Sequence, residues 1–468
     1  IAINNATLGD LTNDTDGEIL GGLSGILIES GADITGSLTN NGSITSTYSA
    51  GIEVNGGSLA DLTNNSGGDI VGGDTGIYLN SGSTVTGTIS NSGNITGTGS
   101  AGIYLSGSSL ADLTNNADGT VTGGYHGISL VNGSNVTGTL TNAGSITATG
   151  SAGVWIDNST LANLTNGTDA SIVGGVYGIY LGNISSITGA LTNDGSIGGT
   201  AGSGLKLNNG TLADLTNGTN GFIEGRDFGI YLDAGSSITG TLTNNGRIAA
   251  TDYHGIYVWN STLTDLTNNS GGDIVGGDTG LYLQNSSSIS GTLTNKGRIT
   301  GATGISVENS TIAGGIVNSG TIEGTDGTAI EMSYLSQGLT MTLNGGRVIG
   351  DIIDNDMMYG HSHVVIGDDF STEGDIEVWD LMVNAGKTLT IRSGDVVTVG
   401  QMLDSTGTLE FGLEGNGVTS KINVIGAGNG IDLEGMTVKV TMGTATMGDG
   451  SELLVGEGNV TVIGFDVI

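Results

Sequence analysis

Aromatic side chains recur at one position of a repeat of about 25 residues, and successive members lie one or two repeats apart. We call this recurring position a column. They are Tyr78, Tyr104, Trp155, Tyr180, Tyr231, Tyr257 and Tyr282, and the same column contains Ser129 and Lys206. Each stands between two aliphatic residues, as Tyr78 does between Ile77 and Leu79. Exposed rows of aromatic rings are typical of surfaces that bind carbohydrate or protein. The column therefore predicts a binding strip.

The same column also has a purely structural interpretation. Rings on neighbouring strands stack on one another, so an aromatic row stabilises a sheet without binding anything. The residue types do not decide between the two interpretations, and both stay open at this point.

Carboxylates are the second group that could do chemistry. Glycosidases need a pair of acids at the scissile bond. Here acids such as Asp61, Asp69 and Asp74 recur with the repeat and do not gather once. The sequence also contains no Gly-x-Ser-x-Gly and no His-Glu-x-x-His motif. We therefore predict no catalytic residues and no enzyme, with a polysaccharide lyase or hydrolase of the β-helix type as the alternative.

One denser acidic cluster lies at Asp351, Asp354 and Asp356, close to His361 and His363. A metal site needs several ligands at a recognisable spacing, which this segment lacks. We predict no metal and no cofactor. The glycine-rich stretch 72–74 resembles part of a calcium-binding nonapeptide, so bound calcium is an alternative left open.

These residues are carried by a long internal repeat. The tripeptide Leu-Thr-Asn begins at Leu11 and returns with spacings that alternate between 27 and 24 residues, which makes a 51-residue double unit. A fixed period of this length indicates units that bury their apolar faces by stacking. Each coil holds three short segments with apolar residues two apart, the strand period, and turn signals between them.

The predicted fold is all-β: a right-handed parallel β-helix, a three-sided solenoid with about 25 residues per coil. Residues 1–330 form the repetitive part. Residues 331–468, which contain all nine Met, form an irregular β C-terminal capping region. The Asn of each tripeptide is predicted to stack as a structural ladder at a corner, where Asn also tolerates left-handed backbone. The ladder comprises Asn40, Asn64, Asn91, Asn115, Asn142, Asn166, Asn193, Asn217, Asn244, Asn268 and Asn295.

Composition excludes several classes of protein. With 46 acidic and 10 basic residues the formal net charge is −36, so nucleic acid is not expected as a partner. The absence of Cys excludes disulfides and thiolate metal sites. No apolar run approaches the roughly 20 residues of a membrane helix. The chain starts at Ile1 without a charged leader, so we expect a cytosolic protein or a removed signal.

The array and the segments after it resemble a known family. Gly386-Lys-Thr-Leu-Thr-Ile391, Gly407-Thr-Leu-Glu-Phe411 and Ser451-Glu-Leu-Leu-Val455 follow a Gly-, Asn-, Ser- and Thr-rich repeat. In this order they are similar to the passenger domain of a bacterial type V autotransporter of the adhesin and pertactin type, with its autochaperone-like C-terminal region. The resemblance implies export across the outer membrane and a cognate outer-membrane barrel in the precursor.

The resulting expectation is a secreted or bacterial cell-surface solenoid that acts in adhesion or surface assembly through its elongated face. Its expected partner is a glycan or protein on a host or neighbouring cell. Self-association is a further expectation, because exposed strand edges promote contacts between copies. A structural subunit of a surface layer or filament is therefore the second alternative.

Overall fold

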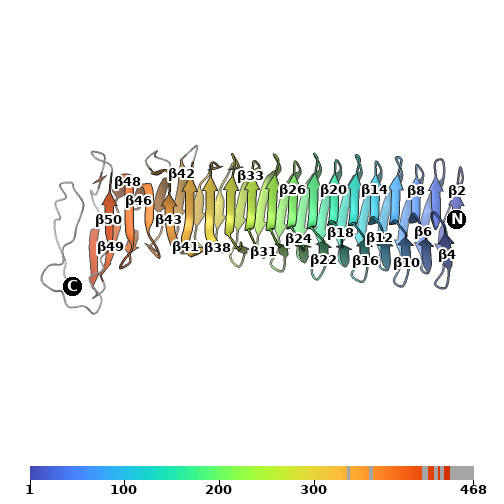
Figure 1. The fold of residues 1–468 in the computed structure, drawn as a ribbon, viewed down its shortest axis with the longest axis horizontal. Coiled ribbons are helices and arrows are strands. Elements are labelled where there is room, and N and C mark those ends of the chain that lie inside the picture. Colours follow the sequence, from blue (N-terminus) through green and yellow to red (C-terminus); the bar gives the residue numbers. More distant parts are fainter. Residues whose placement is uncertain (335–337, 358–361, 414–419, 426–430, 433–436, 443–468) are drawn as a thin grey trace. The chain divides into compact units, whose positions relative to one another are not determined.

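The computed structural model describes residues 1–334, 338–357, 362–413, 420–425, 431–432 and 437–442. It contains two compact units, residues 1–262 and 263–468, which are treated in turn. Both are parallel β-solenoids, which confirms the predicted fold class (Figure 1). The hand of the coil stays a prediction. No helix among the described residues has the length and apolar character needed to cross a membrane.

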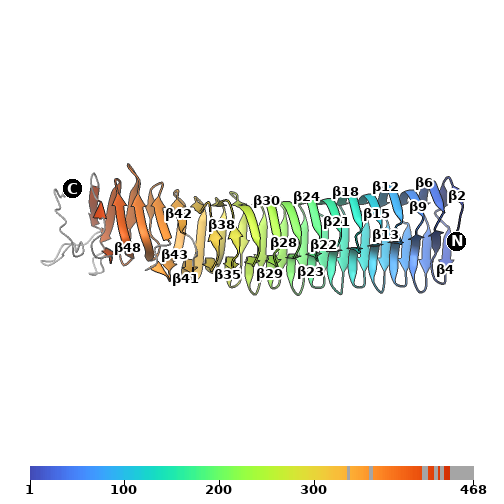
Figure 2. The same cartoon turned by 90° about the horizontal axis from the view of Figure 1, so that it is seen from above.

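Each coil of the first unit contributes strands to three faces (Figures 1 and 2). The first face comprises β1 (Ala2–Ile3), β5 (Ile26–Glu29), β8 (Ala50–Asn55), β11 (Thr75–Asn80), β14 (Ala101–Ser106), β17 (His126–Val131), β20 (Ala152–Asp157), β23 (Tyr177–Gly182), β26 (Ser203–Asn208), β29 (Phe228–Asp233) and β32 (His254–Trp259). Each strand pairs in parallel with the strand one coil away.

The second face contains the Leu-Thr-Asn tripeptides. Its strands are β2 (Thr7–Leu8), β3 (Leu11–Asn13), β6 (Asp33–Asn40), β9 (Ser58–Asn64), β12 (Thr84–Asn91), β15 (Ser109–Asn115), β18 (Asn135–Asn142), β21 (Thr160–Asn166), β24 (Ser186–Asn193), β27 (Thr211–Asn217) and β30 (Ser237–Asn244). The third face is formed by β4 (Glu18–Gly21), β7 (Ser43–Ser46), β10 (Asp69–Gly72), β13 (Asn94–Gly97), β16 (Thr120–Gly123), β19 (Ser145–Ala148), β22 (Ser171–Gly174), β25 (Ser196–Gly199), β28 (Phe222–Gly225) and β31 (Arg247–Ala250).

Columns of aliphatic side chains fill the interior between the three faces. Ile77 and Leu79 from β11, Leu62 from β9 and Ile70 from β10 are fully buried, and the same positions are buried in the coils above and below. Burying one such side chain contributes roughly 1.5–3 kcal/mol. Because the columns run through every coil, this packing sets the register of all three faces.

The asparagines of the second face form a buried hydrogen-bonded ladder. In the first unit the Nδ2 of each Asn donates to the Oδ1 of the Asn in the next coil at 2.8 Å, from Asn13 to Asn244. In the second unit Asn268, Asn295 and Asn318 are linked in the same way. Most of these amides also donate to backbone carbonyls, as Asn64 does to Gly68. Buried amides thus find partners without water.

Left-handed backbone, which Asn tolerates, occurs at other asparagines than those of the ladder. The described residues with positive φ include Asn132, Asn158, Asn209 and Asn260, which follow the strands of the first face. None of the ladder asparagines is among them. Each ladder Asn of the first unit ends a strand of the second face, so its backbone is extended and the tolerance of Asn for left-handed backbone is not used there.

The second unit starts within β33 (Thr262–Asn268). It continues with β34 (Asp273–Val275), β35 (Thr279–Gln284), β36 (Ser288–Ile289), β37 (Leu293–Asn295), β38 (Arg298–Glu308), β39 (Thr311–Ile312), β40 (Ile316–Asn318), β41 (Thr321–Ser333), β42 (Leu339–Leu343), β43 (Arg347–Asp354), β44 (Ser362–Ile366), β46 (Ile376–Val383), β48 (Val396–Ser405), β50 (Lys421–Val424) and β51 (Ile431–Asp432). A separate parallel sheet contains β45 (Phe370–Ser371), β47 (Thr388–Ile391), β49 (Thr408–Leu413) and β52 (Thr437–Met442).

The change of composition near residue 331 does not coincide with a break in the fold, because β41 runs through it. The segments 386–391 and 407–411 contribute β47 and β49. Ser451 to Val455 lie outside the described residues, as does His361.

Candidate functional site

The predicted aromatic column lies on the outside of the first face. In the first unit the residues of the column are in register, so that Tyr78 is level with Tyr104, Trp155 with Tyr180, and Tyr231 with Tyr257. Ser129 and Lys206 occupy the intervening positions, each after two rings. Tyr282 lies in the second unit, level with Ser306.

The rings of the column cover one another. Trp155 and Tyr180 are stacked with their centroids 3.9 Å apart and an interplanar angle of 11°. Tyr231 and Tyr257 are stacked at 5.0 Å, and Tyr78 meets Tyr104 edge-on at 5.3 Å. Each such pair contributes about 0.5–1.5 kcal/mol beyond its buried area. The structural interpretation of the column therefore has direct support, since much of each stacked ring face is occupied by its neighbour.

A second aromatic row, which the sequence reasoning missed, lies three residues before the column. It comprises His126, Tyr177, Phe228 and His254. His126 lies 4.8 Å from Trp155, Tyr177 lies 5.3 Å from Tyr180, and Phe228 lies 4.7 Å from Tyr231. We call the surface formed by both rows on β17, β20, β23, β26, β29 and β32, together with the flanking side chains of Tyr125, Tyr253 and Trp259, the aromatic face. Residues 125–259 hold six of the protein's twelve Tyr and two of its three Trp.

Three rings of the aromatic face are exposed. Tyr125 is 55% exposed, Tyr253 51% and Trp259 39%. Tyr125 and Tyr253 occupy the turns before β17 and β32, five coils apart, which is about 24 Å along the stack. The tetrapeptide Tyr-His-Gly-Ile, which begins at both residues, is the sequence signal that identifies them. These three side chains, rather than the stacked column, offer open ring surface to a partner.

The single lysine of the face is held among rings. Lys206 Nζ lies 4.2 Å from the ring centroid of Tyr231 and 5.9 Å from that of Tyr177, within cation–π range. Its ammonium also pairs with Asp233 at 3.6 Å. Burial lowers the pKa of Lys206, and Asp233 opposes that change.

The electrostatic environment of the face is anionic. Burial is the main reason that the pKa values of the Tyr177, Tyr180 and Tyr231 phenols are raised. Nearby carboxylates raise them further: Asp157 acts on Tyr180, and Asp233 acts on all three. All three phenols therefore stay protonated and able to donate hydrogen bonds at neutral pH.

Two polar atoms within this face make no hydrogen bond with the described part of the chain. They are Ser129 Oγ and Asp157 Oδ1, both buried, and Ser129 as a whole is only 1% exposed. Ser129 is level with Trp155, and Asp157 follows Trp155 by two residues. Lys206 and Asp233 have the same relationship to Tyr231, but they form an ion pair.

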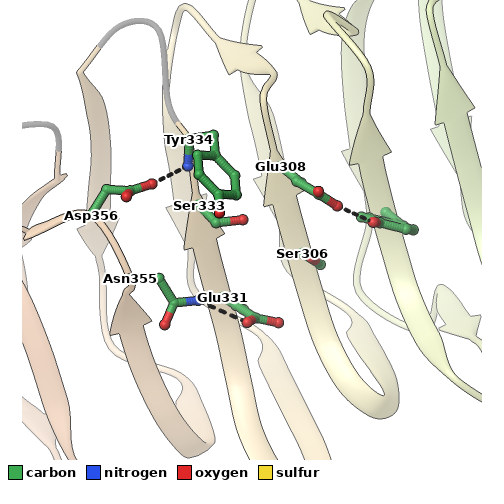
Figure 3. Close-up of a pocket in the computed structure, with 8 residues that line it drawn as sticks. Ser306, Glu308, Glu331, Ser333, Tyr334, Asn355 and Asp356 are labelled. Carbon is green, nitrogen blue, oxygen red and sulfur yellow. Dashed lines mark hydrogen bonds between the residues drawn. The ribbon is translucent and has the colours of Figure 1, made fainter.

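The second unit contains a pocket of about 400 Å³ on its corresponding face. It is lined by Tyr282, Ser306, Glu308, Glu331, Ser333, Tyr334, Asn355 and Asp356 (Figure 3). Its carboxylates accept hydrogen bonds from the chain itself: Glu308 from Tyr282 and Gln284, Glu331 from Asn355 at 2.9 Å, and Asp356 from the Tyr334 amide. Ser306 is small and is level with both Tyr282 and Glu331, which explains the hollow.

Within the described ranges, no group of three His, Cys, Asp or Glu side chains is placed to hold a metal ion. Asp354 accepts hydrogen bonds from Ser362 at 2.5 Å and from the Asp356 amide, and His363 Nδ1 lies 2.8 Å from Asp380. The denser acidic segment is thus used in local contacts, and bound calcium stays an untested alternative.

The fold and the site define a class of protein: a parallel β-solenoid with one aromatic face. Comparison of the chain with protein-family models, curated proteins and solved structures found no match.

Proposed function

We propose that this protein is a surface-displayed or secreted binding module that acts in adhesion, with the aromatic face as its contact surface. The observation that carries the proposal is the concentration of rings on six consecutive coils, together with the exposure of Tyr125, Tyr253 and Trp259. Exposed aromatic side chains on a rigid scaffold dominate the energetics of many interfaces. The buried rings beneath them hold this surface in place.

Display outside the cell rests on the resemblance to autotransporter passengers. The absence of Cys and the strongly acidic composition are compatible with it. The enzyme and filament alternatives stay predictions. The pocket in the second unit gives the enzyme alternative little support, because its acids accept hydrogen bonds from Tyr282, Gln284, Asn355 and the Tyr334 amide.

The test is adhesion of the labelled protein to cultured mammalian cells and to bacterial cells. A variant with Tyr125→Ser, Tyr253→Ser and Trp259→Ser removes the exposed rings but leaves the stacked rows. Tyr48→Ser is the matched control, since Tyr48 is 71% exposed in the first unit but lies outside the aromatic face. We expect the triple variant to lose most of the adhesion and the control to retain it. Equal adhesion of the triple variant and the wild type, or no adhesion of the wild type, would overturn the proposal.

A further inference from the structure

The corner between the first and second faces carries a paired motif once per double coil. The shorter turns at this corner contain a residue of positive φ, and these residues are 51 positions apart: Asn5, Gly56, Gly107, Asn158, Asn209 and Asn260. The second unit repeats the motif at Asn309. Each Asn of this short-turn series is followed two residues later by Thr, at Thr7, Thr160, Thr211, Thr262 and Thr311, whereas the two Gly are followed by Ser58 and Ser109.

The backbone of the turn does not by itself require this pair. Gly56 and Gly107 have φ values of 72° and 60°, and Asn209 has 55°, so glycine and asparagine both satisfy the left-handed turn. That conformation places no condition on the residue two positions later. The joint change from Gly with Ser to Asn with Thr therefore indicates a role in which both side chains act together.

The pair has the sequence of an acceptor for a sugar. Asn-x-Ser/Thr is the motif of N-linked glycosylation, which attaches a bulky glycan to the side-chain amide of Asn and therefore needs a surface position. Every Asn of the short-turn series is exposed, and the Thr that follows it is exposed or half-buried. Both groups of the motif are thus accessible on the folded protein.

The same tripeptide also occurs in the Asn ladder, where the amide is inaccessible. Asn166 and Asn217 each precede Gly-Thr, but both are 0% exposed. Their amides donate to Asn193 and Asn244 in the next coil at 2.8 Å. A sugar on either residue would require the ladder to open.

The longer turns of the alternate coils differ in the hydroxyl. Asn132 and Asn183 are followed two residues later by Ser134 and Ser185, which are each 1% exposed and donate to a carbonyl oxygen three residues earlier. The same buried Ser is present where these turns begin with Ser81 or Ala234, at Ser83 and Ser236. In the longer turns the hydroxyl therefore serves the turn itself.

We propose that the five Asn of the short-turn series are acceptor sites for N-linked glycosylation. In the transfer, Asn Nδ2 forms a bond to C1 of a sugar carried on a nucleoside diphosphate. The bond between C1 and the diphosphate oxygen breaks, the nucleoside diphosphate leaves with the electron pair, and one Nδ2 proton is released. The Thr hydroxyl is the recognition element of the motif and is not consumed.

The sugars of the first unit would follow one edge of the aromatic face. The strands β20, β26 and β32 end at Asn158, Asn209 and Asn260, which are two coils or about 10 Å apart along the stack. Tyr125 and Tyr253 precede their strands and so lie at the opposite edge, and of the exposed rings only Trp259 adjoins a site. The inference does not rest on the proposed function.

The first measurement combines the folded whole protein with UDP-glucose and a soluble glucosyltransferase specific for Asn-x-Ser/Thr, followed by digestion and peptide mass spectrometry. We expect glucose on the short-turn series and none on Asn166. Thr211→Val should lose the sugar at Asn209 and Thr211→Ser should retain it, while Asn158 in the same molecules serves as the internal control. No transfer to the series, transfer to Asn166 as complete as to Asn158, or an undiminished sugar at Asn209 in Thr211→Val would overturn the inference.

The second measurement maps the peptides of the protein isolated from the cells that produce it. We expect a hexose on Asn158, Asn209 and Asn260. A preassembled oligosaccharide at these residues would support the sites but overturn the nucleoside diphosphate donor in favour of a lipid diphosphate. Three unmodified asparagines would overturn the inference whatever the first measurement gives, and would leave the proposed function unaffected.

Discussion

Asp61 Oδ1 accepts the backbone N–H of Thr88 in the next coil at 2.8 Å. Thr88 lies within a β-bulge of β12, where the register with β9 shifts between Val85 and Ile89. The same hydrogen bond recurs every 51 residues. The acceptors Asp10, Asp112, Asn163, Asp214 and Asp265 receive it, in that order, from the backbone amides of Ser37, Thr139, Ala190, Thr241 and Thr292. The repeat is a double coil because a strand that carries Asp or Asn at this position alternates with a strand that carries a bulge.

We predict that Asp61→Ala lowers the free energy of unfolding by about 0.5–1.5 kcal/mol, because the Thr88 amide loses its acceptor. Asp61→Asn is the control, since Asn163 already fills this role towards Ala190 at 3.1 Å. Urea unfolding of both variants checks the prediction. A loss of stability in Asp61→Asn as large as in Asp61→Ala would show that the charge, and not the hydrogen bond, matters.

The ladder predicts a larger effect at Asn115. Its Oδ1 accepts from Asn91 and its Nδ2 donates to Asn142, both at 2.8 Å, inside the core. Asn115→Ala leaves both neighbours with an unmade hydrogen bond, so we expect a loss of roughly 2–3 kcal/mol. Asn116→Ala is the adjacent control, because the side-chain amide of Asn116 is half-buried and donates to the hydroxyls of Ser90 and Ser92. Hydrogen exchange across β12 and β18 measures the local effect, and similar exchange in both variants would contradict it.

Close approach of neighbouring coils makes one glycine column intolerant of substitution. A Cβ on Gly127 would lie 2.5 Å from the Gly153 carbonyl oxygen and 2.6 Å from Ile146. We expect Gly127→Ala to cost at least roughly 1–3 kcal/mol through overpacking. A Cβ on Gly198 would meet nothing closer than 3.9 Å, so Gly198→Ala is expected to be neutral or stabilising by about 0.4–1 kcal/mol. Thermal unfolding that ranks the two variants in the opposite order would refute this.

His126 makes the stability of the aromatic face dependent on pH. Burial among rings lowers its pKa from 6.5 to about 4, so the folded state favours the neutral imidazole. The stabilisation is complete above pH 6.5 and is lost as the pH falls towards 4. Between pH 7 and pH 5 we expect the free energy of unfolding to fall by about 2 kcal/mol from this group.

The control for this effect is His126→Phe, because Phe228 occupies the same position in a later coil. The variant should lose that part of the pH dependence while retaining its fold. Denaturant titrations at the two pH values measure the difference. An identical change in stability for wild type and variant would contradict the prediction.

The parallel solenoid, its apolar columns and the stacking of Asn64 on Asn91 could be predicted from the sequence, because each depends on a side chain that recurs at a fixed interval. The aromatic column was predictable for the same reason. The mutual covering of Trp155 and Tyr180 was not, because strand spacing does not determine ring orientation. Tyr125 and Tyr253 were missed since they stand in turns, outside the strand pattern, where only the shared Tyr-His-Gly-Ile signals them.

The central claim, that a partner binds at the aromatic face, is tested most directly by tryptophan fluorescence. Trp155 and Trp259 lie on this face, and Trp379 is the third tryptophan of the protein. In Trp379→Phe the emission therefore reports on the face alone. During titration with the soluble glycans and proteins released from the cells to which the protein adheres, we predict an emission change with the same midpoint as the inhibition of adhesion. Saturable binding with unchanged emission from both tryptophans would contradict the account.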